Sequence, residues 1–246
     1  MEALVDLILK TIISVESSVN SFIKQNCPHA FTSHEMFGFD IMLDEELKPW
    51  LLEVNISPSL HSGTSLDVAL KSTIAKDVLN LAGIQLPDKR TRKILQPRLP
   101  DELLEVDPAD PYCMDFRLKP GGERSENELH KQIYYVHNYD ETGNIDATIL
   151  SSLTPGDLRV LIETEDEWSR RGGFTRLFPS PFSSGYLKFF DKTRYYNLLL
   201  DEWISQYYHI RETGLAYLEK LCCENVHLIS AKDSPPSANQ WVRPTL

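Results

Sequence analysis

The chain has few cysteines and none of the patterns that cysteine-based sites require. Its 246 residues include four cysteines, at positions 27, 113, 222 and 223. No CxxC pair is present, and these four positions form no plausible disulfide framework in a chain of this length. The sequence therefore argues against a zinc site and against secretion. It predicts a reducing, intracellular environment.

The chain also lacks a long hydrophobic run, a P-loop motif and an overall positive charge. Lys10 and Glu16 interrupt the apolar segment that begins at Leu7, so neither a signal peptide nor a membrane span is predicted. No GxxxxGK[ST] pattern occurs, which excludes a P-loop site within the chain. The formal net charge of −11 argues against general nucleic-acid binding. We expect a globular protein that binds neither nucleic acids nor membranes.

Hydrophobic periodicity predicts a compact α+β unit over residues 1–86. Helical spacing of apolar residues alternates with short segments rich in strand formers, which flank a polar turn. Ser65 is available as the N-cap of the second helix and Gly83 as its C-terminal stop. Because the first helix begins almost at the first residue, we expect that the chain was taken from a longer protein. The predicted elements are a helix over 2–25, strands over 37–43 and 49–55, and a helix over 66–82.

The rest of the chain divides into a linker, a helical unit and a tail. Residues 87–127 contain six prolines and little periodicity, which predicts a partly disordered linker. Residues 128–229 are expected to be mostly helical, with Pro155 near one helix start and Gly172 at its end. Residues 230–246 are expected to be a disordered tail. The helices predicted in the third unit cover 128–139, 154–171 and 195–223.

The predicted hairpin brings three oxygen-bearing side chains to one face. If the turn comprises residues 45–48, Asp40 lies opposite Glu53, and Asn55 shares their face. Two like charges at this separation destabilise a sheet unless a cation lies between them. Two carboxylates and an amide oxygen suit magnesium that retains water and shares phosphate oxygens. The alternative is a surface hairpin whose acids face water. The opposite, hydrophobic face is expected to be continuous core, formed by Phe37, Phe39, Ile41, Leu43, Trp50, Leu52 and Val54.

The sequence around the hairpin resembles the tubulin tyrosine ligase-like family of ATP-grasp ligases. Asp followed by Glu-x-Asn on the next strand is the metal-binding signature of ATP-grasp enzymes, and the match extends over about the first eighty-five residues. The later segments are most similar to the type-four polyglutamylase subtype. The motifs that carry the family resemblance are Phe37-Gly38-Phe39-Asp40, Leu47-Lys48-Pro49-Trp50-Leu51-Leu52-Glu53-Val54-Asn55, Ser57-Pro58-Ser59-Leu60, Leu66-Asp67 and Lys71. Those that carry the subtype are Thr154-Pro155, Glu165-Asp166-Glu167, Ser169-Arg170-Arg171, Phe178-Pro179-Ser180 and Tyr195-Tyr196-Asn197.

The resemblance implies the C-terminal part of an ATP-grasp core, ATP and two magnesium ions as cofactors, and free glutamate as a substrate. An acceptor glutamate is activated as an acyl phosphate, and the incoming amino group then forms an isopeptide bond. Asp40, Glu53 and Asn55 would hold the metal and, through it, the ATP phosphates. Lys71 and His61 are weaker catalytic candidates, since a solvated helix face and a polar loop explain them equally well. The adenine-binding and substrate-binding elements of the family lie upstream of the matched segment, so the isolated chain is expected to be inactive.

A basic stretch interrupts the acidic chain between Trp168 and Tyr196. It contains six cations and the single acid Asp191, an asymmetry that favours an acidic partner. Interleaved aromatic residues could suit nucleic-acid stacking, but no RNA-binding motif accompanies them. A hydrophobic loop with solvated charges is the open alternative. The candidate partner-binding residues are Arg170, Arg171, Arg176, Lys188, Lys192 and Arg194.

The family resemblance implies that this stretch docks on glutamate-rich tubulin tails, with other acidic proteins as possible partners. It also implies a monomer in the cytoplasm, on the microtubule cytoskeleton, at a cilium or basal body. Two other hypotheses stay open. One is a non-catalytic microtubule or acidic-protein binding module that retains the hairpin only as a fold element. The other is an ATP-grasp ligase acting on a small-molecule acid.

Overall fold

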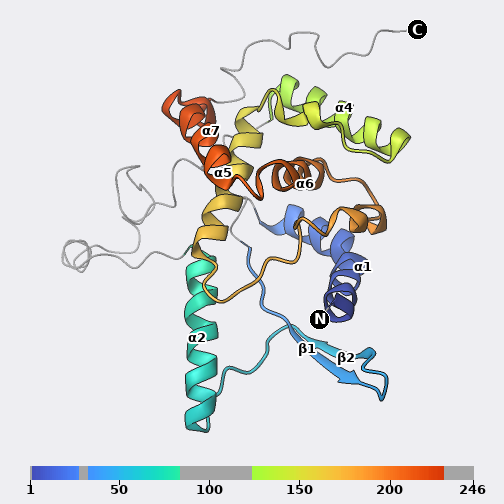
Figure 1. Ribbon diagram of the computed structural model, residues 1–246, viewed down its shortest axis with the longest axis vertical. Coiled ribbons are helices and arrows are strands. Elements are labelled where there is room, and N and C mark those ends of the chain that lie inside the picture. Colours follow the sequence, from blue (N-terminus) through green and yellow to red (C-terminus); the bar gives the residue numbers. More distant parts are fainter. Residues whose placement is uncertain (1, 28–32, 84–123, 230–246) are drawn as a thin grey trace, which may run out of the picture.

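The protein consists of helices and one antiparallel β-hairpin (Figure 1). The computed structural model describes residues 2–27, 33–83 and 124–229. Mixed helices with a hairpin were expected, and this is confirmed. The predicted linker, apart from residues 124–127, and the whole of the predicted tail lie outside the described residues. The elements are α1 (Glu2–Asn26), β1 (Gly38–Leu43), β2 (Pro49–Asn55), α2 (Ser65–Leu81), α4 (Glu126–Thr142), η3 (Ala147–Leu150), α5 (Pro155–Arg170), η4 (Ser184–Phe189), α6 (Tyr195–Tyr207), α7 (Arg211–Cys223) and η5 (Val226–Leu228).

Helices α4 to α7 enclose the main hydrophobic core. The core cluster lies between Tyr135 and Leu218 and includes Leu158, Leu161 and Leu199, all of which are fully buried. α5 crosses the middle of this unit, with α6 and α7 packed against it (Figure 1). Burial of large aliphatic and aromatic side chains is the main stabilising contribution in such a unit.

The first two helices attach to this helical unit at different places. α1 contacts η4, where the Tyr186 hydroxyl donates to the Asp6 carboxylate at 2.9 Å. α2 meets the lower end of α5 (Figure 1). There the Asp77 carboxylate, on α2, accepts from the Gly173 N–H at 2.9 Å. The hairpin itself extends away from the helical unit.

The hairpin has the predicted pairing at its open end and a different pairing near its turn. Asp40 lies opposite Glu53, as predicted. The predicted four-residue turn is wrong, because the Asp44 N–H donates to the Lys48 carbonyl at 3.1 Å and closes a three-residue loop. A register shift after Asp40 leaves Leu52 as the extra residue of a bulge. The loop is one residue shorter than predicted and the bulge adds one residue to β2, so the pairing of Asp40 with Glu53 is retained.

The bulge also corrects the predicted hydrophobic face. Ile41 pairs with Leu51 rather than with Leu52, and Leu51 is half-buried. Trp50 and Leu52, expected in a continuous core, are 49% and 62% exposed. Alternation cannot be extrapolated through a bulge, because the extra residue moves the following side chains to the other face.

Three helix boundaries also differ from the sequence predictions. α4 begins at Glu126, inside the predicted linker, because Ser125 and Glu128 form a capping box. α2 is capped by Thr64 rather than Ser65. The helix predicted over 195–223 is two helices, α6 and α7. No helix in the described ranges is both long enough and apolar enough to cross a membrane.

The break between α6 and α7 allows the two helices to pack closely. A Cβ atom at Gly214 would lie 2.9 Å from Tyr207 Cγ and 3.0 Å from Trp203 Cζ2. Glycine therefore permits an approach that any side chain would obstruct. The chain must turn at residues 208–210 to bring α7 back onto these aromatic rings.

Candidate functional site

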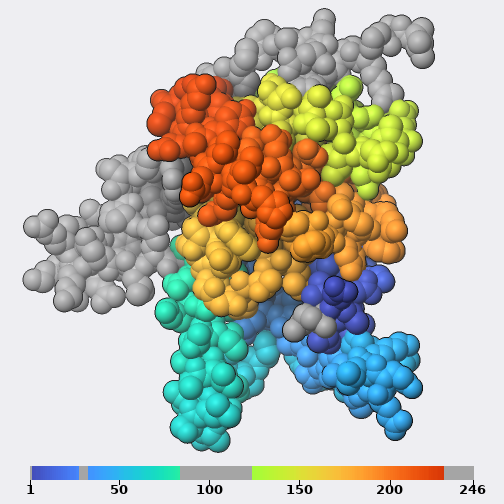
Figure 2. Space-filling model, viewed as in Figure 1, coloured from blue at the N-terminus to red at the C-terminus, as the bar shows by residue number. Residues whose placement is uncertain are grey.

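The hairpin places the three predicted metal ligands together on one exposed face. Asp40 and Glu53 are cross-strand partners, and Asn55 lies opposite Gly38. The Asn55 amide nitrogen donates to the Glu53 carboxylate at 3.2 Å, which leaves the amide oxygen available to a cation. The hairpin and the lower part of α2 project as separate lobes (Figure 2). Asp40, Glu53 and Asn55 are all exposed to solvent.

Two local features hold the hairpin in this form. A Cβ atom at Gly38 would lie 3.0 Å from Pro58 Cβ, so glycine lets the loop after β2 pack against β1. At the turn, the Asp44 carboxylate accepts from the Trp50 indole N–H at 2.7 Å and the Lys48 N–H at 2.8 Å. These hydrogen bonds hold the pKa of Asp44 below its usual value, and the hydrogen bond from the Trp50 indole contributes most to this effect. Both ends of the hairpin are thus restrained.

The donor set fits magnesium better than a transition metal. No group of three or more His, Cys, Asp or Glu side chains in the described ranges is placed to bind a metal. The predicted ligands are instead two carboxylates, of Asp40 and Glu53, and the amide oxygen of Asn55. These hard oxygen donors suit magnesium, which keeps several water ligands and also binds phosphate oxygens. The cross-strand pair of carboxylates is also repulsive in the absence of a cation.

Lys71 and His61 lie together beside the loop that follows β2. The Lys71 ammonium donates to the His61 backbone carbonyl at 2.6 Å. Thr64 and Asp67 form a capping box at the start of α2, and the hydrogen bond from the Thr64 hydroxyl lowers the pKa of Asp67. In this structure Lys71 anchors the loop.

The six predicted partner-binding cations have different local contacts. Arg194 forms a two-pronged ion pair with Glu16 on α1, with its Nη2 at 2.9 Å. Arg170 lies near Glu163 and Asp166 at the end of α5. Lys188 lies over the Phe189 ring at 5.3 Å, and Lys192 is exposed. Two of the six cations, Arg170 and Arg194, are therefore paired with acids that lie outside the basic stretch in the sequence.

Arg171 and Arg176 both lie over the Trp168 ring. Their guanidinium carbons lie 4.0 Å and 4.6 Å from the centre of the Trp168 ring. Arg171 also donates to the Trp168 carbonyl at 2.7 Å. Cation–π contact with a single indole thus gathers two positive charges at the end of α5.

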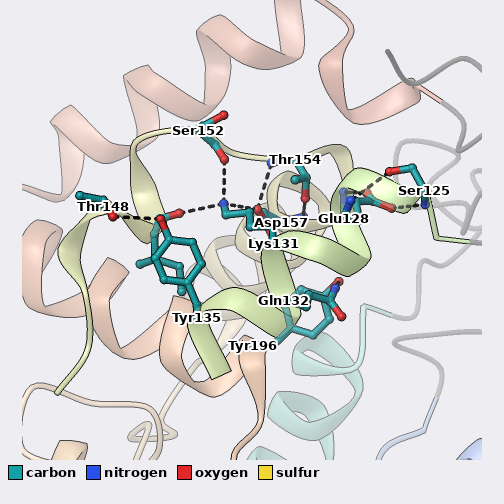
Figure 3. A network of polar contacts seen from close by, with 12 residues as sticks. Ser125, Glu128, Lys131, Gln132, Tyr135, Thr148, Ser152, Thr154, Asp157 and Tyr196 are labelled. Carbon is teal, nitrogen blue, oxygen red and sulfur yellow. Dashed lines mark hydrogen bonds and ion pairs between the residues drawn. The ribbon is translucent and has the colours of Figure 1, made fainter. Parts of the chain in front are cut away.

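A buried polar network joins the first turns of α4 and α5 (Figure 3). Lys131 has no exposed surface, and its ammonium donates to the Asp157 carboxylate and the Ser152 carbonyl, each at 2.7 Å. Burial lowers the pKa of Lys131. In return, the Glu128 carboxylate of α4 accepts from the Gly156 N–H of α5 at 2.7 Å. This arrangement fixes the two helices to each other.

Sequence reasoning did not find this network. The capping patterns Ser125-x-x-Glu128 and Thr154-x-x-Asp157 were available as signals. No sequence signal marked the link between these two patterns through Lys131, because lysine is rarely fully buried unless it is paired. The network is distant in sequence from the hairpin ligands, and its groups are satisfied by one another. It is a structural feature of the helical unit.

Comparison with known proteins gives the family. Residues 1–93 match the sequence model of the tubulin-tyrosine ligase family. Tubulin monoglutamylase TTLL4 of Homo sapiens is 40% identical over 99% of this chain and 20% of its own length. Tubulin polyglutamylase ttll-4 of Caenorhabditis elegans is 41% identical over 88% of this chain and 33% of its own length. Tubulin polyglutamylase TTLL5 of Homo sapiens is 34% identical over 71% of this chain and 13% of its own length.

The chain therefore spans a third or less of the length of each of these relatives. The family match covers α1, the hairpin and α2, whereas the similarity to TTLL4 continues through the helical unit. The predicted metal ligands lie inside the matched segment. On these matches, the chain belongs to the tubulin-tyrosine ligase family.

Proposed function

We propose that this chain is part of an ATP-dependent protein-glutamate ligase that modifies tubulin. It supplies the metal-binding lobe of an ATP-grasp core and an appended helical unit. The observation that carries the proposal is the pairing of Asp40 with Glu53, with Asn55 on the same face. The relatives named as tubulin glutamylases support tubulin as the acceptor.

The chemistry assigned to the chain is electrostatic. Magnesium, when bound, would neutralise the phosphate charge of ATP while the γ-phosphoryl group passes to the acceptor carboxylate, which gives an acyl phosphate and ADP. Attack by the amino group of the incoming glutamate would then form the isopeptide bond and release phosphate. Asp40, Glu53 and Asn55 would provide oxygen ligands for two such ions and thereby position the phosphates. The restrained hairpin keeps these ligands in place, so little reorganisation is required when nucleotide binds. Free glutamate is the second substrate.

The remaining parts of an active site must come from outside the described residues. Large hydrophobic side chains stay exposed on α1, on both strands of the hairpin and on α2. Phe22 on α1 is 68% exposed and Leu66 on α2 is 65% exposed. Exposed apolar surface of this extent marks an interaction face. We assign it to the rest of the ligase core, and we expect the chain alone to be inactive.

The proposed partner is the acidic tail of tubulin. The cations at the end of α5 and in the segment before α6 would attract it, most directly Arg171 and Arg176, which are gathered at Trp168. Lys188 and Lys192 could add long-range attraction, which salt should weaken. We also propose a location on cytoplasmic microtubules, including those of cilia, and a monomeric state.

Glutamate incorporation by the full-length protein tests the ligase assignment. Glu53→Gln keeps the size of the side chain and removes its charge, so we expect incorporation to fall by about a hundredfold or more. Glu45→Gln in the exposed hairpin turn is the matched control and should retain activity. Normal incorporation by Glu53→Gln would contradict the metal role. It would favour the alternative of a non-catalytic binding module.

A further inference from the structure

The helical unit holds α1 through the segment that leads into α6. Arg194, the last residue before α6, pairs with Glu16 of α1 through its Nε at 3.2 Å and its Nη2 at 2.9 Å. The two side chains are only 22% and 23% exposed, and a shielded, two-pronged pair of this kind is stronger than a pair in open solvent. Ser17 of α1 also donates to the Asp191 carboxylate at 3.0 Å. α1 is therefore fixed to the start of a core helix.

The helical unit holds α2 at a second place, just after the end of α5. Asp77 on α2 is buried, and its carboxylate accepts from the Gly173 N–H. A Cβ atom at Gly172 would lie 2.3 Å from the carboxyl carbon of Asp77, so glycine allows α2 to approach this closely. α2 is thus fixed to the end of another core helix.

The hairpin that carries the proposed metal ligands is attached to both of these helices. α1 contacts β2, and Lys71 on α2 donates to the His61 carbonyl in the loop that follows β2. α1 and α2 are separated in space and lie below α6 and α5 respectively (Figure 1). No residue of β1 or β2 is buried. The place of the hairpin relative to the helical unit therefore depends on how α1 and α2 are held.

We propose that Arg194 and Asp77 are positioning residues, which together lock the hairpin at a fixed place relative to the helical unit. The hairpin carries the proposed metal ligands, and the helical unit carries the proposed acceptor-binding cations. With a fixed separation between them, an acceptor held on the helical unit presents one stretch of its length to the reacting phosphate. The lock thereby selects which glutamate is modified. This inference rests on the proposed function for its chemistry, whereas the lock itself can be tested without that chemistry.

The distance between two spin labels tests the lock in the 246-residue chain, without metal, ATP or acceptor. The labels are placed at Glu45 in the hairpin turn and at Glu219 on α7, which are both exposed, after the native cysteines are replaced by serine. Double electron–electron resonance should give one narrow distance distribution. Arg194→Glu replaces the ion pair by repulsion from Glu16 and Asp191, so the distribution should widen about twofold or more, as expected for units that are no longer held together.

Charge exchange separates the lock from a general loss of stability. Adding Glu16→Arg to Arg194→Glu restores an ion pair of reversed direction, so the distribution should become narrow again. Arg211→Gln is the matched control for Arg194→Gln, since Arg211 pairs with Glu165 at 2.7 Å entirely within the helical unit. Only Arg194→Gln should widen the distribution. An unchanged width in Arg194→Glu, no recovery on charge exchange, or equal widening by the two glutamine variants would overturn the proposal.

Mass spectrometry of purified tubulin modified by the full-length protein tests the selection of the acceptor glutamate. Arg194→Glu should spread the added glutamates over more positions, and the further change Glu16→Arg should restore the original pattern. The same pattern in the unsubstituted protein and in Arg194→Glu would overturn this role of the lock. Absence of incorporation by the unsubstituted protein would instead contradict the proposed function, and the spin-label distances would still decide whether the lock exists.

Discussion

The matched region and the helical unit differ in how much of their hydrophobic surface they bury themselves. Within the described residues 2–27 and 33–83, only Leu9 and Ile13 are buried hydrophobic residues. The helical unit, 124–229, holds the whole core cluster from Tyr135 to Leu218 and the buried Lys131–Asp157 pair. The hairpin makes few contacts beyond its own two strands.

The region with the proposed chemistry is therefore not the region that stabilises the fold. The hairpin geometry depends on local contacts, such as the hydrogen bonds of Asp44 at the turn and the contact of Gly38 with Pro58. The helical unit depends on a shared core. Changes in the helical unit should therefore alter global stability, whereas changes at Glu53 should alter metal binding alone.

The largest expected effect comes from breaking the buried ion pair. Lys131→Met leaves the Asp157 charge buried without its partner, so we expect the free energy of unfolding to fall by about 3–5 kcal/mol. Chemical denaturation measures this. Adding Asp157→Asn to Lys131→Met should recover part of the loss, because no buried charge remains. A loss below about 1 kcal/mol would contradict the importance of the pair.

A second change should stabilise the helical unit. Asp201 is buried, and burial, with some repulsion from Glu202, raises its pKa from 3.8 to about 6. The Asp201 carboxyl thus binds its proton more tightly in the folded state than in the unfolded state. The free energy of unfolding therefore falls as pH rises from about 4 to 6, and above pH 6 the whole cost of burying the charged carboxylate remains.

Asp201→Asn should remove this fall and stabilise the chain at pH 7 by about 1–3 kcal/mol. Thermal or chemical unfolding at several pH values measures the difference. The exposed Glu219→Gln provides the matched control. Unchanged pH dependence in Asp201→Asn would show that this carboxyl does not titrate as described.

A smaller effect is expected at the contact between α2 and the segment that follows α5. Asp77 on α2 holds the Gly173 N–H at 2.9 Å, next to Gly172 with φ +55°. Asp77→Ala leaves that N–H without its acceptor, at a cost of about 1–2 kcal/mol. Hydrogen exchange should show faster exchange in α2 and little change in α6. Lys76→Ala, at an exposed position, should leave α2 unchanged.

The features set by local sequence were largely predictable. The hairpin, the start of α5 at Pro155 and the end of α2 near Gly83 follow from alternation, capping and glycine preference. The pairing of Asp40 with Glu53 was predicted from a turn of the wrong length. It survives because the bulge at Leu52 compensates for the shorter loop.

The features set by tertiary contacts were not predictable. Apolar periodicity continues through Ile210 without glycine or proline, so nothing local marks the break between α6 and α7. The break is explained only by the packing of Gly214 against Trp203 and Tyr207. Likewise, charge counting treated Arg194 as available to a partner, whereas Glu16, far away in sequence, binds it.

The most direct test of the central claim is metal binding at the hairpin. Manganese(II) can replace magnesium at oxygen sites, and it broadens the NMR signals of nearby nuclei. We predict that titration of the 246-residue chain broadens the signals of Asp40, Glu53 and the Asn55 side-chain amide first. Glu45→Gln should preserve this pattern and Glu53→Gln should abolish it. Broadening that is the same in Glu53→Gln, or that is centred elsewhere in the chain, would contradict the account.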